Sequence, residues 1–452
     1  MSQTLSEKLA SFVCRLDYAE LPARVVEKAK TCLIHGIGVG LAGYQTDFPR
    51  IAADIAKKAG TSDQQATLLY DGSTAAPMEA AFANAVLFHS RVQEDTHNTA
   101  HLGTVVIPVA LALGEAGRKS GKELLSALVA GYEVGGALSK HYTAYTTPRG
   151  FRASSVYGIF AATAAAAKLL GLSEIQTVHA LGFAASFAFG TLEAFTAGSM
   201  EWRFENGLAA KNGLLSALLA QHGAVATRYA FEGKAGFLHA FAGNREEPLK
   251  CAESLGKAYE LMNVTFKLYP VCAFNQTPVI NTLQLTEERD IPLEQIEAIT
   301  IEMNEYEANY PGMSAKGPFA NISQTLMSAP YCVAVALLEK DVTLANLQKY
   351  DHAELNRLIA KTTVLPSRQL QPLSSKISIR LHNGQVLVRE MNISEEYYNL
   401  GIDQDIQLIR GLIGEMPIGR AQLDQLIDDI LHLEEIGDTS VMLHHIADRS
   451  TF

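Results

Sequence analysis

The chain has 452 residues, of which 48% are hydrophobic and 19% are charged. This length favours two domains over one hydrophobic core, and this composition excludes a disordered chain. Lys and Arg number 37 against 48 for Asp and Glu, which gives a net charge of −11. The chain also contains no run of basic residues, so nucleic acid is excluded as a partner.

The cysteines and the N-terminal residues indicate in which cellular compartment the protein is expected. The five cysteines are scattered and form no C-x-x-C pair, which argues against both a disulfide framework and a structural zinc site. The N-terminal residues lack the pattern of an export signal, and no window reaches the ~18 uninterrupted apolar residues of a membrane span. We therefore expect a cytoplasmic protein without a membrane partner.

Helical periodicity runs from Leu5 to about Thr265. Ser120 and Glu123 form a capping box that predicts a helix start, with a buried stripe at Leu124, Leu128 and Tyr132. Ala-rich stretches at 158–172 and 179–190 predict helices whose small faces pack closely on other helices.

The pattern changes after Tyr269-Pro270. Residues 298–304 alternate apolar and polar side chains, as a half-buried strand does, and 376–391 place two alternating runs around Asn383-Gly384, which predicts a two-residue hairpin turn. From about Ile402 the helical period returns, and we expect this tail to rejoin the first domain. The predicted domains are a helical one over 1–265, an α+β one over 266–398, and returning helices over 399–452.

The segment 93–103, QEDTHNTAHLG, gathers polar groups between apolar stretches. His97 and His101 are four residues apart, which on a helix would place both rings on one face, a spacing found in metal sites. The zincin pattern is absent, however, and a structural role for one or both histidines is a second alternative. The third alternative is an acid/base cluster in which Asp95 tunes an imidazole and Thr96 or Thr99 binds a substrate carboxylate. The density of polar groups favours this third interpretation.

Two further segments carry charged groups. Residues 147–158 precede the Ala-rich helix and bring Arg152 and Ser155 to its start, where free backbone N–H groups attract anions; Ser154 or Ser155 as a simple N-cap is the alternative. Arg203 could pair with a carboxylate in bidentate fashion, or be held by Glu201 or Glu205. We find no phosphate-binding Gly-rich loop, so no nucleotide cofactor is indicated.

Taken together, several motifs resemble the MmgE/PrpD family over nearly the whole chain. They are E-D-T-H…H-x-G with VVIPVALALGE (105–115), G-F-x-x-S-S-V-Y-G with its Ala-rich continuation, G-x-A-A-x-x-G (207–213), K-x-Y-P-x-C (267–272) and P-Y-C-V-A-V-A-L-L (330–338).

The resemblance implies a large all-helical domain with a smaller α/β lid domain, a homodimer, and an active site between the domains without metal or organic cofactor. It also implies a lyase or isomerase that removes a proton next to a carboxylate of a small polycarboxylate. The resemblance places Asp95, Thr96, His101, Lys267 and Tyr331 at active-site positions. We expect the catalytic residues to be His101, Asp95, Tyr331, Lys267 and His97, with the sequence leaving open which histidine faces the cleft. The residues expected to bind substrate are Thr96, Arg152, Ser155, Arg203 and Gln276.

Some positions depart from the family pattern. Arg152 and Gln276 stand where many members have a histidine, Trp202 stands at the position of a lysine, and Glu94 replaces the first of two aspartates. Arginine and glutamine are poor proton-transfer groups. Elimination of water, as in 2-methylcitrate dehydratases, comes first among the reactions. Epimerisation of the iminodisuccinate type follows closely because it needs no leaving-group acid, and cis-aconitate-type decarboxylation comes third. An inactive binding paralogue is the remaining alternative.

Overall fold

The computed structural model describes residues 3–60, 62–244 and 247–447. It divides into a large unit, made of residues up to Thr191, Trp202–Phe266 and the chain from Leu400 on, and a smaller unit, made of Leu192–Glu201 and Lys267–Asn399. The fold is mainly α with one small mixed sheet in the second unit, the class that the sequence predicts.

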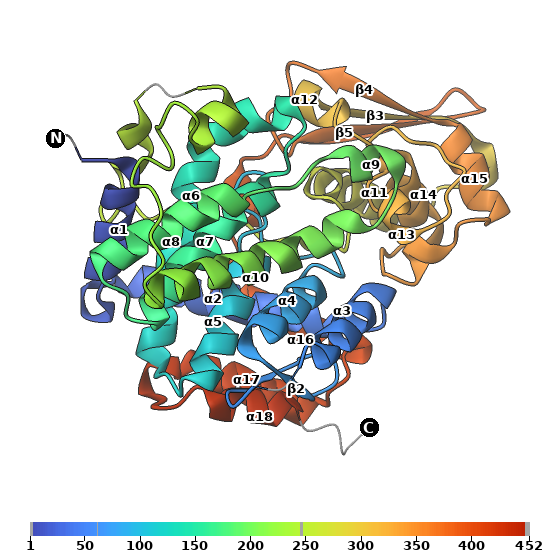
Figure 1. Cartoon of the computed structure of the whole chain (residues 1–452). Helices are drawn as coiled ribbons and strands as arrows, with labels where there is room; N and C mark the ends of the chain where they lie inside the picture. Colours follow the sequence, from blue (N-terminus) through green and yellow to red (C-terminus); the bar gives the residue numbers. More distant parts are fainter. Residues whose placement is uncertain (1–2, 61, 245–246, 448–452) are drawn as a thin grey trace. The chain divides into compact units, whose positions relative to one another are not determined.

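The large unit is a stack of helices around an apolar core (Figure 1). Its longest helix, α6 (Gly121–Thr146), starts at the predicted capping box of Ser120 and Glu123 and packs along the Ala-rich helix α7 (Ala153–Leu169). Small residues allow this close approach: a Cβ on Gly131 would lie 3.0 Å from the carbonyl oxygen of Ala161. The remaining elements of this unit up to residue 221 are α1 (Leu5–Arg15), α2 (Ala23–Ala42), α3 (Asp47–Lys58), β1 (Ala66–Thr67), β2 (Thr74–Ala75), α4 (Pro77–Phe88), α5 (Gly103–Ala116), α8 (Glu174–Phe187) and α10 (Glu201–Gln221), whose first residue belongs to the smaller unit.

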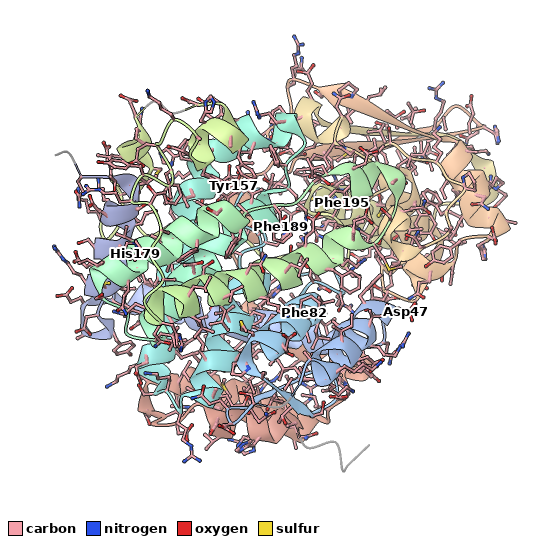
Figure 2. All side chains as sticks on the ribbon, viewed as in Figure 1. Asp47, Phe82, Tyr157, His179, Phe189 and Phe195 are labelled. Atoms are coloured by element: carbon pink, nitrogen blue, oxygen red, sulfur yellow. The ribbon has the colours of Figure 1, made fainter. Side chains whose placement is uncertain are left out.

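Helix α10 crosses the large unit against α4. A Cβ on Gly207 would lie 2.7 Å from the ring of Phe82, which Figure 2 labels below α10. A larger residue at this position would have to displace the Phe82 ring. The pair β1–β2 is an antiparallel ladder of two residues per strand, a small addition to the all-helical domain that the sequence predicts.

The C-terminal helices pack on the large unit. They are α16 (Ile402–Gly411), α17 (Arg420–Leu431) and α18 (Ser440–Ala447), drawn in red in Figure 1. Helices α16 and α17 contact α2, and α18 contacts α5 and α17. A Cβ on Gly38 of α2 would lie 2.5 Å from Ile409, which is fully buried. The return of the tail to the helical body is therefore close-packed.

The smaller unit contains a four-stranded sheet in the order β4-β3-β5-β6. Strand β3 (Ile296–Asn304) pairs in parallel with β4 (Thr362–Ser367) and antiparallel with β5 (Ser375–Leu381), which pairs with β6 (Val386–Met391). The alternation expected at 298–304 is confirmed, since Ile299, Ile301 and Met303 are buried. The helices of this unit are α9 (Glu193–Ala197), α11 (Gln276–Glu288), α12 (Glu305–Ala308), α13 (Ile322–Thr325), α14 (Ala329–Glu339) and α15 (Ala353–Ala360).

The hairpin turn differs from the two-residue prediction. Leu381 and Gln385 close the loop with the bond from Leu381 N to Gln385 O, so His382, Asn383 and Gly384 form a three-residue connection. Only Gly384 among them has positive φ, at 85°. This is the pattern of a type I turn followed by a glycine in the left-handed region, the common three-residue loop.

Among the described residues, no helix combines the length and the apolar character that crossing a membrane requires.

Candidate functional site

The polar segment between α4 and α5 is an irregular loop and not a helix. Its backbone turns at Val92 and Asn98, which have φ values of 60° and 52°. Asparagine tolerates this left-handed region, whereas a β-branched valine does so only under strain. The helical spacing considered for His97 and His101 is therefore wrong, and the two rings have different surroundings.

His97 is held inside the helical unit. Its Nδ1 lies 3.2 Å from the hydroxyl of Ser139, and its Nε2 lies 3.1 Å from a carboxylate oxygen of Glu260. Glu260 also accepts a bond from Lys140 Nζ at 2.9 Å. The imidazole is 3% exposed and both ring nitrogens have partners, which favours the structural alternative for this histidine. The catalytic role expected for His97 stays a prediction.

His101 has the setting of an acid/base residue. Its Nδ1 lies 3.1 Å from the carbonyl oxygen of Asp95 and 3.3 Å from Glu94 Oε1, and the side chain is 17% exposed. A carbonyl oxygen only accepts hydrogen bonds, so Nδ1 carries the hydrogen and the lone pair of the neutral ring is on Nε2. The main-chain N–H of His101 donates to Ser154 Oγ at 3.1 Å, which fixes the residue at the entry to α5.

The carboxylate beside His101 belongs to Glu94 and not to Asp95, the residue expected to tune the imidazole. Asp95 Oδ1 accepts from the N–H of Gly103 at 3.1 Å, and Oδ2 accepts from the hydroxyl of Tyr132. Burial raises the pKa of Asp95. Its side chain thus fastens the loop to α5 and α6, and only its carbonyl oxygen meets the ring.

A second imidazole, His89, shares the same carboxylate. Its Nδ1 lies 3.3 Å from Glu94 Oε1, and its Nε2 accepts from Arg152 Nη2 at 2.8 Å. Burial lowers the pKa of His89 to about 4, and the neighbouring charges of Arg152 and Arg203 contribute in the same direction. His89 is therefore neutral near pH 7, with its hydrogen on Nδ1 facing Glu94. The ring centroids of His89 and His101 are 5.4 Å apart.

Arg152 has internal partners, which changes the role expected for it. Besides His89, its guanidinium donates to the carbonyl oxygen of Trp202 at 2.6 Å and to Asn206 Oδ1 at 2.7 Å, and lies 3.4 Å from Glu205. The residue is 3% exposed. Arg152 therefore joins α7 to α10 and places a permanent positive charge behind His89, instead of offering a free fork to a substrate carboxylate.

The serines at the start of α7 are not N-caps, because Arg152 is the cap residue and makes no side-chain capping bond. Ser154 accepts from the backbone of His101, as described above. Ser155 Oγ donates to Glu205 Oε2 at 3.0 Å, so its hydroxyl serves the same buried carboxylate as Arg152. The proposed substrate contact of Ser155 is thus replaced by an internal one.

Arg203 and Trp202 lie on the first turn of α10. Arg203 Nη1 donates to the carbonyl oxygens of His89 and Ser90 at 3.1 and 2.7 Å, and its guanidinium lies 4.3 Å from the Trp202 ring. The Trp202 ring meets His89 edge-on, with 4.9 Å between centroids. Trp202, which stands at the lysine position of the family pattern, therefore places an aromatic ring against His89.

Thr96 lies directly beside the proposed base. Its backbone pairs with Thr265 through bonds of 2.8 and 2.9 Å, and its hydroxyl lies 3.4 Å from His101 Nδ1. The Thr99 hydroxyl is buried without a hydrogen-bond partner among the described residues. Thr96 therefore has a fixed main chain next to the imidazole, and its expected contact with substrate stays a prediction.

Three expected site residues belong to the smaller unit. Lys267 is 2% exposed, and Tyr331 is fully buried near the start of α14 with its ring edge-on to Phe319. Burial raises the pKa of the Tyr331 phenol, which makes it a hydrogen-bond donor or acid and not a base near neutral pH. The roles of Lys267 and Tyr331 stay predictions.

Gln276 is a structural residue of the smaller unit. Its Oε1 accepts from the N–H groups of Leu268 and Tyr269 at 2.9 and 3.0 Å, and its Nε2 donates to the carbonyl oxygens of Tyr269 and Val271 at 2.9 and 3.1 Å. An amide side chain has two donor hydrogens and two acceptor lone pairs, and this loop uses all four. These internal bonds favour a structural role, and the substrate contact expected for Gln276 stays a prediction.

Sequence reasoning did not find several of these groups. The sequence indicates Glu94 only as an exchange against the family pattern and Glu205 only as a possible partner of Arg203, and it gives no role to His89 or Asn206. Among the described residues, no group of three or more His, Cys, Asp or Glu side chains is placed to hold a metal ion. A polar residue in an otherwise apolar stretch, such as His89 after VLF, was the one available signal.

Comparison with known proteins identifies the family. Residues 7–249 match the MmgE/PrpD N-terminal domain and residues 269–393 match the MmgE/PrpD C-terminal domain. The chain belongs to the MmgE/PrpD family. Curated relatives include the cis-aconitate decarboxylase-like protein oryM of Aspergillus oryzae, 27% identical over 97% of this chain and 96% of the relative. Others are the cis-aconitate decarboxylases of Aspergillus terreus, 25% identical over 97% and 95%, and of Homo sapiens, 25% identical over 98% and 94%.

For this MmgE/PrpD protein, the cluster around His101 in the helical unit is the candidate site. It combines an imidazole with a defined tautomer, a carboxylate shared between two imidazoles, and two arginines within the same buried group.

Proposed function

We propose that this protein is a lyase that acts on a small di- or tricarboxylate without a cofactor, with proton transfer at a carbon next to a carboxylate. The observation that supports the proposal most directly is the setting of His101, whose Nδ1 faces the Asp95 carbonyl and Glu94 while its side chain retains access to solvent. Because the hydrogen of the neutral ring is on Nδ1, its lone pair is on Nε2, the atom that we propose exchanges a proton with a ligand.

Glu94 is the partner that makes this exchange favourable. When Nε2 takes a proton, the ring becomes an imidazolium, and a carboxylate oxygen 3.3 Å from Nδ1 stabilises the new charge. Arg152 and Arg203 add positive charge to the far side of His89, which favours the approach of a substrate carboxylate and the extra negative charge that forms after C–H cleavage.

The relatives favour decarboxylation among the possible lyase reactions, because those compared here are cis-aconitate decarboxylases or named after them. In that reaction the bond to the departing carboxylate breaks, its electron pair moves into the conjugated chain, and imidazolium Nε2–H delivers a proton to carbon. In elimination of water the same ring acts as a base and not as an acid. Neutral Nε2 takes the proton from carbon, and the hydroxyl group leaves as water with a proton from a second acid.

Substrate and reaction are tested together by NMR in D2O with aconitate, citrate, methylcitrate and aspartate-type compounds. Carbon dioxide release with deuterium in the product supports decarboxylation, and alkene formation from a hydroxy acid supports dehydration. Exchange at the α-carbon without loss of substrate would instead indicate an epimerase. No exchange and no turnover with any of them would contradict an enzyme of this class and favour a binding paralogue.

We also propose that the protein forms a homodimer through the face formed by α8 and residues 224–230. Helix α8 lies against this segment, since His179 Nδ1 is 2.9 Å from the carbonyl oxygen of Ala226, and Figure 2 labels His179 on α8. Ile175, Val225 and Tyr229 on this face are 71%, 75% and 47% exposed. Large apolar side chains exposed along a helix and the segment that lies against it are typical of an interaction surface.

A further inference from the structure

A buried ion pair between α2 and α16 anchors the loop that carries Glu94 and Asp95. His35 of α2 lies with Nδ1 2.6 Å from Asp405 Oδ1 of α16, and its Nε2 donates to the carbonyl oxygen of Gln93 at 2.8 Å. Both side chains of the pair are 0% exposed. Asp405 thus holds the ring of His35, and His35 in turn holds Gln93, the residue before Glu94.

A second ion pair reaches the same loop from the turn after α16. Arg91 forms a bidentate pair with Glu415, in which Nη2 donates to Oε1 at 3.0 Å and Nη1 donates to Oε2. Arg91 Nε donates to Gln93 Oε1 at 2.6 Å. Two residues of the C-terminal tail, Asp405 and Glu415, therefore determine the position of Arg91 and Gln93.

The backbone between these two anchors is strained. Val92 has φ of 60°, a conformation that a β-branched residue adopts only when its surroundings impose it. Without the anchors, Val92 would relax toward negative φ, and this rotation would turn the peptide units that lead to Glu94.

We propose that the C-terminal tail positions the candidate catalytic loop, with His35, Asp405, Arg91 and Glu415 as positioning residues that act through Gln93 and Val92 on Glu94. The expected effect on kcat rests on the proposed function. The expected effect on the position of the loop rests only on the geometry described above. The C-terminal helices are then part of the active-site framework, and not only a cover for α2.

The kinetic experiment compares Asp405→Asn and Glu415→Gln with wild type on the compound that turns over. Both changes keep the shape of the side chain and remove its charge. Because a displaced Glu94 weakens the proton-transfer step, we expect kcat to fall roughly ten- to a hundredfold, as misplacement by about 1 Å does, with KM changed less than threefold. The exposed Asp403 of α16 supplies the matched control Asp403→Asn, and Asp405→Glu is expected to restore part of kcat.

A second measurement does not depend on activity. Hydrogen exchange by mass spectrometry reads the amides of residues 91–103, where the N–H groups of Thr96, His97 and Gly103 are hydrogen-bonded. We expect Asp405→Asn and Glu415→Gln to accelerate exchange in this segment at least fivefold, and Asp403→Asn to leave it unchanged.

The outcomes separate the two proposals. Wild type inactive on every compound, with exchange accelerated in the variants, overturns the proposed function and supports the positioning role. Unchanged exchange in 91–103, or a loss confined to KM, overturns the positioning role whatever the activity. Glu415→Gln keeps the test decisive if Asp405→Asn fails to fold, because Glu415 is 34% exposed and the amide oxygen of the variant can still accept a hydrogen bond from Arg91.

Discussion

In the proposed reaction, His101 transfers the proton and Glu94 stabilises the positive charge that results on the imidazole ring. This division depends on the tautomer of His101, which the carbonyl oxygen of Asp95 sets by accepting from Nδ1 at 3.1 Å. A change to either residue should affect the chemical step before it affects substrate affinity.

The most direct prediction at this scale is that His101→Ala lowers turnover by ~10² or more, since removal of a general acid or base commonly costs that much. The measurement is kcat on the compound identified by NMR. The exposed His222 provides the control His222→Ala, which should retain wild-type rates. Wild-type turnover in His101→Ala would remove this residue from the mechanism.

His89 makes stability depend on pH. Its pKa is about 4 in the folded protein and the ordinary value is 6.5, so the unfolded chain binds a proton on His89 that the folded protein does not bind between these values. Stability therefore falls as the pH falls from 6.5 to 4, by at most about 1.4 kcal/mol per pH unit from this group.

In His89→Asn we expect urea unfolding curves to show a shallower loss of stability between pH 6.5 and pH 4.5, even though the variant loses its bond to Arg152. His222→Asn should retain the wild-type slope. Equal slopes in wild type and His89→Asn would show that His89 is already protonated in the folded state.

At the scale of elements, the start of α5 requires glycine. A Cβ on Gly103 would lie 2.5 Å from both Asp95 Oδ2 and the Tyr132 hydroxyl, so the junction between loop and helix would have to open. Gly103→Ala should lower the free energy of unfolding by about 1–3 kcal/mol, the usual cost of overpacking, and reduce turnover as well. Gly411→Ala in α16, where nothing lies within 4 Å of the added Cβ, is the control and should cost nothing.

Helix α6 carries a buried carboxyl group, Glu133, whose pKa is raised to about 8 by burial. Its Oε1 accepts from the N–H of Leu261 at 2.9 Å, and Oε2 has no hydrogen-bond partner among the described residues. The folded protein thus holds a proton on Glu133 that the unfolded chain releases above the ordinary value of 4.5, and stability is lost as the pH rises toward 8.

Glu133→Gln keeps the acceptor for Leu261 and removes this titration. We expect the variant to be roughly 2–4 kcal/mol more stable than wild type at pH 9 and little different at pH 4.5, measured by urea unfolding. The exposed Glu253 gives the control Glu253→Gln, which should follow wild type at both values. A variant no more stable than wild type at pH 9 would show that Glu133 does not hold its proton.

Local signals explain what the sequence predicts well. The capping box at Ser120, the alternation at 298–304 and the return of helical period near Ile402 depend on neighbours within a few residues, and each is found in the structure. Strand β4 was not predicted, because its parallel pairing with β3 joins residues some sixty positions apart. The hairpin loop was predicted one residue too short, since the choice between a two- and a three-residue connection depends on the register of β5 and β6.

The candidate site was predictable only in part for the same reason. His101 and Arg152 stand out from the local density of polar and charged residues, and the family motifs add to that signal. The sequence favours Asp95 as the carboxylate beside the ring, because it does not show the strained turn at Val92 that directs Glu94 there instead. Gln276 was expected to contact substrate, and only the structure shows that one loop takes all four of its hydrogen bonds. No sequence pattern predicts the contact between His35 and Asp405, because the two residues are 370 positions apart.

At the scale of the whole molecule, the proposed homodimer can be tested on the α8 face. Val225→Asp together with Ile175→Asp places charges where two apolar side chains are most exposed, so we expect light scattering after gel filtration to shift from twice the chain mass to the chain mass. Val386→Asp, on an exposed position of β6, should leave the mass unchanged. A wild-type protein that elutes as a monomer would rule out the homodimer.

The ion pair between His35 and Asp405 joins positions 370 residues apart. At the usual speed of translation, on the order of 20–70 s separates the synthesis of these two residues. A nascent chain still attached to the ribosome therefore has its second α-helix and its polar loop long before it has the carboxylate that fixes them. If the positioning role is right, catalytic competence would be acquired only after Asp405 on α16 has emerged from the ribosome and reached His35.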